Sequence, residues 1–86
     1  MMNLQDSFLA FLKKEKNEVV IYLVNGFQLR GIITGFDNFT ILFENTEGKP
    51  QMVYKHAVTT VHPVKGIDYE LFKESVRSLS IKKPAD

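Results

Sequence analysis

The N-terminal segment carries its apolar side chains at the spacing of a helix. The positions that fall on one face of such a helix are Leu4, Phe8, Leu9, Phe11 and Leu12. Asn3 can cap the start of this helix, and Asp6 lies in its first turn, where the helix dipole favours an anion. We therefore predict an amphipathic helix that ends near Lys16 and Asn17.

Beyond Glu18 the helical spacing gives way to short runs rich in β-branched and aromatic residues, which are typical of strands. The predicted strands are EVVIYLV from Glu18, FQLRGIITGF from Phe27, TILFEN from Thr40, QMVYK from Gln51 and VTTVH from Val58. Asn25-Gly26 predicts a hairpin through a type I′ turn, which needs positive φ at both central residues. FDNF, from Phe36, predicts the next turn by its Asp-Asn content. The last two strands are joined by a connection too short for anything but a sharp turn.

This order of elements predicts the fold class. One helix and five short strands indicate a mostly β domain, with an N-terminal α-helix on a five-stranded, strongly bent antiparallel sheet that forms a small barrel. Gly31 and Gly35 permit the bending. The last two predicted strands carry no proline or inward charge, so we expect subunits to associate through these edges. A chain of 86 residues needs such added stability, because small domains bury little surface.

The composition changes after Pro63, and we divide the chain into a domain over residues 1–63 and a C-terminal tail over residues 64–86. Asp68 can cap a helix within this tail. The apolar stripe of that helix would comprise Leu71, Phe72, Val76 and Leu79. Two alternatives stay open for the tail: it is disordered or only transiently helical, or its helix docks stably on the domain.

Composition and charge exclude several classes of protein. The net charge of +1 provides no general field that would draw the monomer to nucleic acid or to a membrane, so anion binding depends on local placement. The absence of cysteine excludes disulfides and thiolate metal sites, and two histidines make a poor zinc site. No stretch approaches the ~20 apolar residues of a membrane span, and the N-terminus does not resemble a signal peptide. We expect a soluble, cytoplasmic protein without a metal or other cofactor.

The adjacent Lys55 and His56 are the most unusual candidates for chemistry. We expect no enzyme, because the chain has no cysteine nucleophile and no G-x-S-x-G, H-E-x-x-H or nucleotide-binding sequence. An ordinary exposed turn would use Gly, Asn, Asp or Pro, and this turn has none of them. Lysine and histidine can instead hold a phosphate or a base. Phe36 and Phe39 are equally consistent with core positions and with a stacking platform for bases.

Several segments resemble the Hfq family of bacterial Sm-like RNA chaperones. The most specific are LQD from Leu4, YLVNG from Tyr22, FDNF from Phe36 and YKHA from Tyr54, within a resemblance that covers Leu4 to Pro63. The resemblance implies a homohexameric ring, closed by pairing the fourth strand of one subunit with the fifth strand of the next. It also implies single-stranded RNA as the partner: U-rich small regulatory RNA on one face and A-rich messenger RNA on the other, with the ring promoting their pairing. The alternative is a Sm-like ribonucleoprotein scaffold without annealing activity.

The same resemblance assigns residues to three RNA-contacting surfaces. The proximal surface, which takes U-rich RNA at the central pore, would comprise Gln5, Asn38, Phe39, Lys55 and His56. The distal surface, which takes A-rich RNA, would comprise Tyr22, Leu23, Gly26, Phe27, Gln28, Leu29, Arg30, Gln51 and Thr60. The rim would comprise Lys13, Lys14 and Lys16, a cluster that charge alone would assign to a solvated helix end.

Several features depart from the pattern of the family. Arg30 stands where many relatives have glutamine, and a guanidinium reads guanine edges as readily as adenine edges. The rim consists of lysine instead of arginine. This predicts weaker strand annealing than in a relative with an arginine rim, because lysine cannot form two parallel hydrogen bonds with a phosphate. His62 stands where an aliphatic residue is usual.

Overall fold

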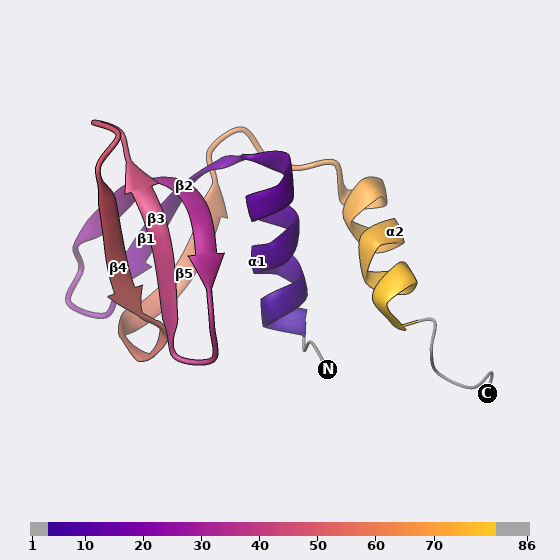
Figure 1. The fold of residues 1–86 in the computed structure, drawn as a ribbon, viewed down its shortest axis with the longest axis horizontal. Helices are drawn as coiled ribbons and strands as arrows, with labels where there is room; N and C mark the ends of the chain where they lie inside the picture. Colours follow the sequence, from indigo (N-terminus) through magenta and orange to yellow (C-terminus); the bar gives the residue numbers. More distant parts are fainter. Residues whose placement is uncertain (1–3, 81–86) are drawn as a thin grey trace.

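The computed structural model describes residues 4–80, with their side chains as far as residue 74 (Figure 1). The elements in chain order are α1 (Leu4–Glu15), β1 (Glu18–Leu23), β2 (Gln28–Phe36), β3 (Thr40–Asn45), β4 (Pro50–Tyr54), a 3₁₀ turn (Lys55–Ala57), β5 (Val58–Pro63) and α2 (Tyr69–Ser80). The predicted N-terminal helix and five-stranded, bent antiparallel sheet are therefore confirmed. The predicted helix cap, Asn3, lies outside the described residues.

The strands form one antiparallel sheet in the order β4-β3-β2-β1-β5, so β4 and β5 are its two edges. The pairing register shifts at two points, between Ile33 and Gly35 in β2 and between Tyr22 and Leu23 in β1. Such irregularities increase the bend and twist of a strand. Figure 1 shows α1 alongside the curled sheet and α2 on the far side of α1.

The edge strands differ from the expectation in one respect. β4 begins with Pro50 and β5 ends with Pro63, whereas the sequence pattern predicted both edges without proline. Each proline lies at the end of its strand, where a missing N–H interrupts the hydrogen-bond ladder least. The middle of both edges therefore keeps its N–H groups available for pairing.

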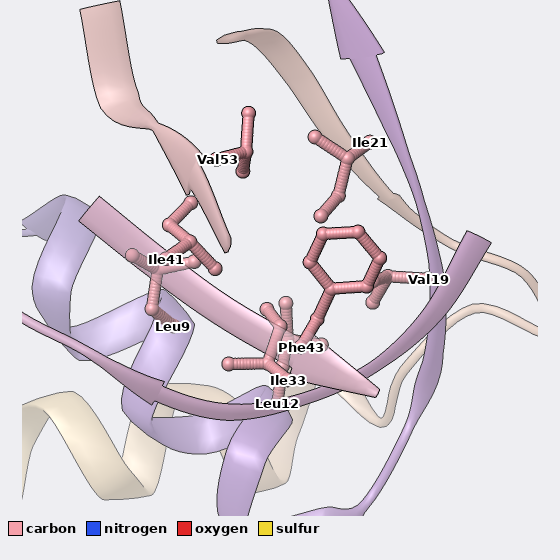
Figure 2. Close-up of a cluster of buried hydrophobic side chains, with 8 residues drawn as sticks. All are labelled: Leu9, Leu12, Val19, Ile21, Ile33, Ile41, Phe43 and Val53. Atoms are coloured by element: carbon pink, nitrogen blue, oxygen red, sulfur yellow. The ribbon is translucent and has the colours of Figure 1, made fainter. Parts of the chain in front are cut away.

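The core lies between α1 and the inner face of the sheet (Figure 2). Its buried side chains are Leu9, Leu12, Val19, Ile21, Ile33, Ile41, Phe43 and Val53. Leu9 and Leu12 come from the predicted apolar face of α1, and Val19 and Ile21 come from alternate positions of β1. Burying one such side chain contributes about 2 kcal/mol. The helical spacing of α1 and the alternating spacing of the strands therefore place their apolar side chains in one core.

The β1–β2 hairpin does not contain the predicted type I′ turn. Gly26 has a φ of 92°, but Lys16 is the only non-glycine residue with positive φ among the described residues, so Asn25 is not left-handed. Gly26 N–H donates to the carbonyl of Leu23 at 2.9 Å, and Asn25 Oδ1 accepts from the N–H of Phe27 at 3.0 Å. The loop is therefore a turn followed by one left-handed glycine, and the asparagine side chain stabilises the turn by its own hydrogen bond.

The tail contains a helix that docks on the domain. Asp68 Oδ1 accepts from the N–H of Leu71 at 3.1 Å and caps α2. The Phe72 ring packs edge-on against Phe8 and Phe11 of α1, with centroid distances of 5.5 and 5.4 Å. Leu71, although part of the predicted stripe, is 45% exposed. The other two residues of that stripe, whose side chains lie outside the described ones, are Val76 and Leu79.

Asp37 closes the turn between β2 and β3. Its Oδ1 accepts from the backbone N–H groups of Phe39 and Thr40 at 2.8 and 2.7 Å, and from the Thr40 hydroxyl at 2.7 Å. These hydrogen bonds, above all that from Phe39 N–H, hold the pKa of the Asp37 carboxyl below its ordinary value. The ionised carboxylate is therefore part of the folded turn.

Gly31→Ala is expected to destabilise the protein by about 2 kcal/mol, because overpacked positions are strained. The added Cβ would overlap the carbonyl oxygen of Glu44 and lie 3.0 Å from Cα of Asn45, and these are backbone atoms of β3. Gly35→Ala is the matched control, because its Cβ would meet Leu42 side-chain atoms at an ordinary 3.9 Å. Urea unfolding at one protein concentration compares the variants, and equal midpoints would show that the close approach at Gly31 is not required.

Asp37→Ala is expected to destabilise the protein at neutral pH and to lose this effect in acid. Because the folded pKa of Asp37 lies below 3.8, its contribution is complete above that value and disappears as the pH falls through the lower, folded pKa. Urea unfolding of the wild type and the variant across the acid range measures the difference in free energy of unfolding. Asn38→Ala, which removes a neighbouring side chain without a carboxylate, controls for the turn. A difference that persists unchanged into strong acid would contradict this role of the carboxylate.

Candidate nucleic-acid interface

Two turns meet at one end of the sheet. The backbone N–H of Lys55 donates to the carbonyl of Phe39 at 2.8 Å, which joins the 3₁₀ turn after β4 to the turn between β2 and β3. Phe39 is not a core residue, because 73% of it is exposed. Asn38 and His56 are exposed as well. The structure therefore brings four of the predicted proximal residues to one end of the sheet.

Lys55 is held in place by helix α1. Its Nζ lies 2.8 Å from Asp6 Oδ1, and the two side chains are only 11% and 16% exposed. The same ammonium lies 5.6 Å from the ring centroid of Phe36. Gln5, the fifth predicted proximal residue, precedes Asp6 on α1 and is exposed. The charge of Lys55 is thus balanced within the subunit, and its first role is to join α1 to the turn.

His56 has the opposite environment. Its ring stacks on that of Tyr54, with centroids 5.7 Å apart and an interplanar angle of 28°. His56 is exposed, and so is Tyr54, at 55%. Stacking orients the imidazole without using its ring nitrogens, which can donate or accept a hydrogen bond. His56 therefore offers a ligand its polar ring atoms, on the turn that is hydrogen-bonded to the backbone of Phe39.

Most of the predicted distal residues lie on or beside the β1–β2 hairpin, on the outer face of the sheet. Directly paired residues of neighbouring strands share a face, so Tyr22, Gln28 and Thr60 form one row across β2, β1 and β5. Gly26 and Phe27 lie in the hairpin loop, where Phe27 is 68% exposed. This row and the loop make a surface on which extended RNA could lie.

Three predicted distal residues are placed differently. Leu23 and Leu29 are half-buried and pack against the core. Gln51 is exposed on β4, at the opposite edge of the sheet from Thr60 on β5. A single subunit therefore does not bring Gln51 together with the hairpin.

Arg30 lies on the outer face in an ion pair. Its Nε donates to Glu18 Oε2 at 2.8 Å, and the side chains are 53% and 39% exposed. The pairing register places Val20 between Arg30 on β2 and His62 on β5. Arg30 thus extends the distal surface by one row toward residues that the resemblance does not assign.

The three rim lysines gather at the C-terminal end of α1. Lys13 and Lys14 lie in its last turn, and all three rim residues are exposed. Lys16 has a φ of 55° and ends the helix in the left-handed conformation. The N–H of Asn17 then donates to the carbonyl of Leu12 at 3.1 Å. The ammonium groups therefore lie at the opposite end of α1 from the Asp6–Lys55 ion pair.

An exposed apolar patch lies on the outer face of β3 and the edge strand β4. Leu42 pairs directly with Met52, and these residues are 40% and 58% exposed. Tyr54, two residues further along β4, shares this face. Apolar side chains gathered beside an open sheet edge are typical of an interface.

Sequence reasoning missed the partners that organise these surfaces. Asp6 was assigned only to the helix dipole, yet it binds a lysine 49 residues away. Glu18 and Tyr54 received no role in binding, although they contact Arg30 and His56. The only signal in the sequence was the opposite charge of the ionic partners, which cannot select one pair among many.

Neither a membrane-spanning helix nor a metal-binding cluster is found among the described residues. Within residues 4–80, no helix is long and apolar enough to cross a membrane. The described residues also contain no group of three or more side chains that could hold a metal ion together.

Comparisons with known proteins agree with this architecture. The family model described as Hfq protein matches residues 4–68. RNA-binding protein Hfq of Bacillus thuringiensis (strain Al Hakam) and that of Bacillus mycoides (strain KBAB4) are each 59% identical over 70 residues, which cover 81% of this chain and 93% of theirs. A crystal structure of the pleiotropic translational regulator Hfq matches with a TM-score of 0.66 and 35% identity, over 70% of this chain and 98% of its own. The chain therefore belongs to the Hfq family.

Proposed function

We propose that this chain is an RNA chaperone. It binds U-rich small regulatory RNA on the proximal surface and A-rich messenger RNA on the distal surface of a homohexameric ring, and it promotes their pairing. The observation that carries the proposal is the junction of two turns, where the Lys55–Phe39 backbone hydrogen bond joins the turn that carries the exposed Phe39 ring to the turn that carries the exposed His56 imidazole. Aromatic faces with nearby polar donors are how proteins hold unpaired bases. The 59% identical relatives are themselves named RNA-binding proteins.

The two open edges of the sheet support the ring. Pairing β4 of one subunit with β5 of the next would satisfy the backbone groups of both edges. The apolar patch of Leu42, Met52 and Tyr54 lies beside the β4 edge and would gain cover from the neighbour. The same pairing brings Gln51 of one subunit toward Thr60 of the next, which would complete the distal surface.

The proposed way of binding RNA follows from how charge is distributed on the subunit. With a net charge of +1, one subunit has little attraction for RNA, so binding depends on repeated local contacts. A ring presents each weak contact six times to one RNA, and the high effective concentration makes them act together. The rim lysines at the end of α1 are free of the core and can contact the phosphates of a second strand. The proposal involves no reaction at a covalent bond.

His56→Ala is expected to weaken oligo-uridine binding about tenfold or more, since a base contact is worth about 1–3 kcal/mol. Oligo-adenine, on the other face, should bind nearly as before, and fluorescence anisotropy with both labelled RNAs measures the two affinities. Phe27→Ala, in the hairpin loop, is the matched variant and should weaken oligo-adenine instead. Parallel loss on both RNAs in either variant would contradict the assignment of two separate faces.

Lys55→Ala is a less direct probe of the same surface. The substitution would leave the largely buried Asp6 carboxylate without its lysine, and breaking such a pair lowers the free energy of unfolding by about 3 kcal/mol. The His56 substitution avoids this loss, because that side chain is exposed.

Met52→Glu is expected to dissociate the ring, because it places a charge in the proposed interface. Met52 is 58% exposed, so the subunit itself should stay folded. Light scattering should give about 59 kDa for six copies of the 9.9-kDa wild-type chain and a lower mass for the variant. Val24→Glu, at a residue that is 66% exposed in the hairpin loop, is the control and should keep the wild-type mass. A wild-type mass near 10 kDa, or an unchanged mass for Met52→Glu, would contradict the proposed ring interface.

A further inference from the structure

A pocket lies where the end of α1 meets the start of α2. The two helices run in opposite directions, so that the last turn of α1 is beside the first turn of α2 (Figure 1). The volume of the pocket is about 310 Å³, comparable with the smaller ligand pockets of proteins. It is therefore large enough for a flat ring system such as a nucleobase.

One side of the pocket is apolar. Phe11 and Ile67 line it from the domain and from the β5–α2 connection, and Leu71 lines it from α2. The Phe11 ring is fixed by its edge-on contact with Phe72. Leu71 belongs to the apolar stripe of α2 and is nevertheless 45% exposed. A ligand with an apolar face would remove this surface from water, which is favourable.

The polar lining of the pocket is rich in hydrogen-bond acceptors. It contains the carboxylates of Glu15 and Asp68 and the side-chain amide of Asn17. Asn17 Oδ1 is buried and has no hydrogen-bond partner among the described residues. A buried acceptor without a partner is costly, and a small rotation of the amide would let an N–H group of a ligand reach it. The lining therefore favours a ligand that brings N–H donors.

Lysines surround this acceptor-rich lining. Lys65 lines the pocket, and the rim residues Lys14 and Lys16 flank Glu15 in the sequence. The N–H of Val64 donates to the carbonyl of Glu18 at 2.9 Å, which holds the Lys65 segment against the end of α1. A wholly cationic ligand would be repelled by these ammonium groups, whereas a phosphate would be attracted. The pocket thus fits a ligand with N–H donors inside and an anionic group outside.

We propose that this pocket binds one unpaired nucleotide of RNA whose base carries an amino group. The base lies in the pocket, and its phosphate lies on Lys65 and the rim lysines. The inference rests on the proposed function, because RNA held at the rim supplies the nucleotide, and it adds a site that the docked tail helps to build. Cytosine and adenine present an amino group that a carboxylate can accept. Uracil presents carbonyl oxygens on both sides of its single N–H, so the carboxylates of Glu15 and Asp68 would face acceptors.

A general charge effect is the rival explanation for any influence of Glu15 on RNA. A carboxylate repels phosphates, so its removal would strengthen the binding of every RNA. The proposed pocket predicts the opposite sign for an RNA with amino-bearing bases, because the same carboxylate accepts a hydrogen bond from the base. The direction of the change therefore separates the two explanations.

The test uses the full chain and labelled oligo-cytidine, whose binding is measured by fluorescence anisotropy. Saturating unlabelled oligo-uridine and oligo-adenine occupy the proposed proximal and distal surfaces. We expect Glu15→Gln to weaken oligo-cytidine binding about fivefold, as the loss of one hydrogen bond to a charged group allows. Glu47→Gln, which removes a carboxylate from the β3–β4 loop, is the matched control and should not weaken it.

A second pair of variants tests the part played by the tail. Phe72→Ala removes the ring that packs on Phe8 and Phe11, so it should release α2 and weaken oligo-cytidine at least as much as Glu15→Gln does. Tyr69→Ala is the control on the same helix, because Tyr69 is 64% exposed, and it should leave the affinity unchanged. Oligo-uridine binding, measured alone, should not weaken in any of these variants.

Unchanged or tighter oligo-cytidine binding by Glu15→Gln, or unchanged binding by Phe72→Ala, would overturn the pocket. Absence of oligo-cytidine binding by the wild type would also overturn it, and would leave the proposed function standing if oligo-uridine and oligo-adenine still bind. Failure of those two RNAs to bind would overturn the proposed function itself. Free cytidine monophosphate should displace the RNA only at about a 100-fold excess, because it lacks the neighbouring phosphates. Displacement at equal concentration would overturn RNA as the source of the nucleotide.

Discussion

The bend of the sheet is the constraint on which the rest of the structure depends. A flat sheet of five short strands would give α1 only one shallow face to pack on. The bent sheet instead surrounds Phe43, and Leu12 of α1 covers it, so that both residues are 0% exposed. The bend requires β2 and β3 to approach so closely that Gly31 has no room for a Cβ. It also carries the turn after β4 to the carbonyl of Phe39. The geometry that forms the core therefore also builds the proximal surface.

The Asp6–Lys55 ion pair ties the helix to that surface. A largely buried ammonium is costly unless it is paired, and Asp6 supplies the partner from α1. The pair leaves Lys55 with little charge to offer, so the proposed contacts with RNA fall mainly on the exposed rings of Phe39 and His56. On this proposal the lysine shapes the site, while the neighbouring residues face the ligand. Repetition around a ring would then convert modest contacts into tight binding.

The distal surface depends on register instead of burial. Strand pairing sets Tyr22 beside Gln28 and Thr60, and the same pairing sets Arg30 one row away with Glu18 as its partner. Gln28, Arg30 and Thr60 are exposed and Tyr22 is only half-buried, so packing in the core does not dictate their identity. This face is therefore the part of the domain where the choice of base can change without changing the core.

The sequence by itself determined the helix face, the five strands and the clustering of aromatic and basic residues at their turns, because side-chain periodicity is a local property. The prediction of a type I′ turn in the β1–β2 hairpin was wrong, because the Asn25 side chain accepts a hydrogen bond from Phe27 N–H and Gly26 is the single left-handed residue of the turn. It left the tail open, because docking through Phe72 depends on a surface that exists only after α1 has folded. Only the tertiary structure decided which opposite charges meet, since that choice follows from the bend and the register of the sheet, which no local pattern encodes.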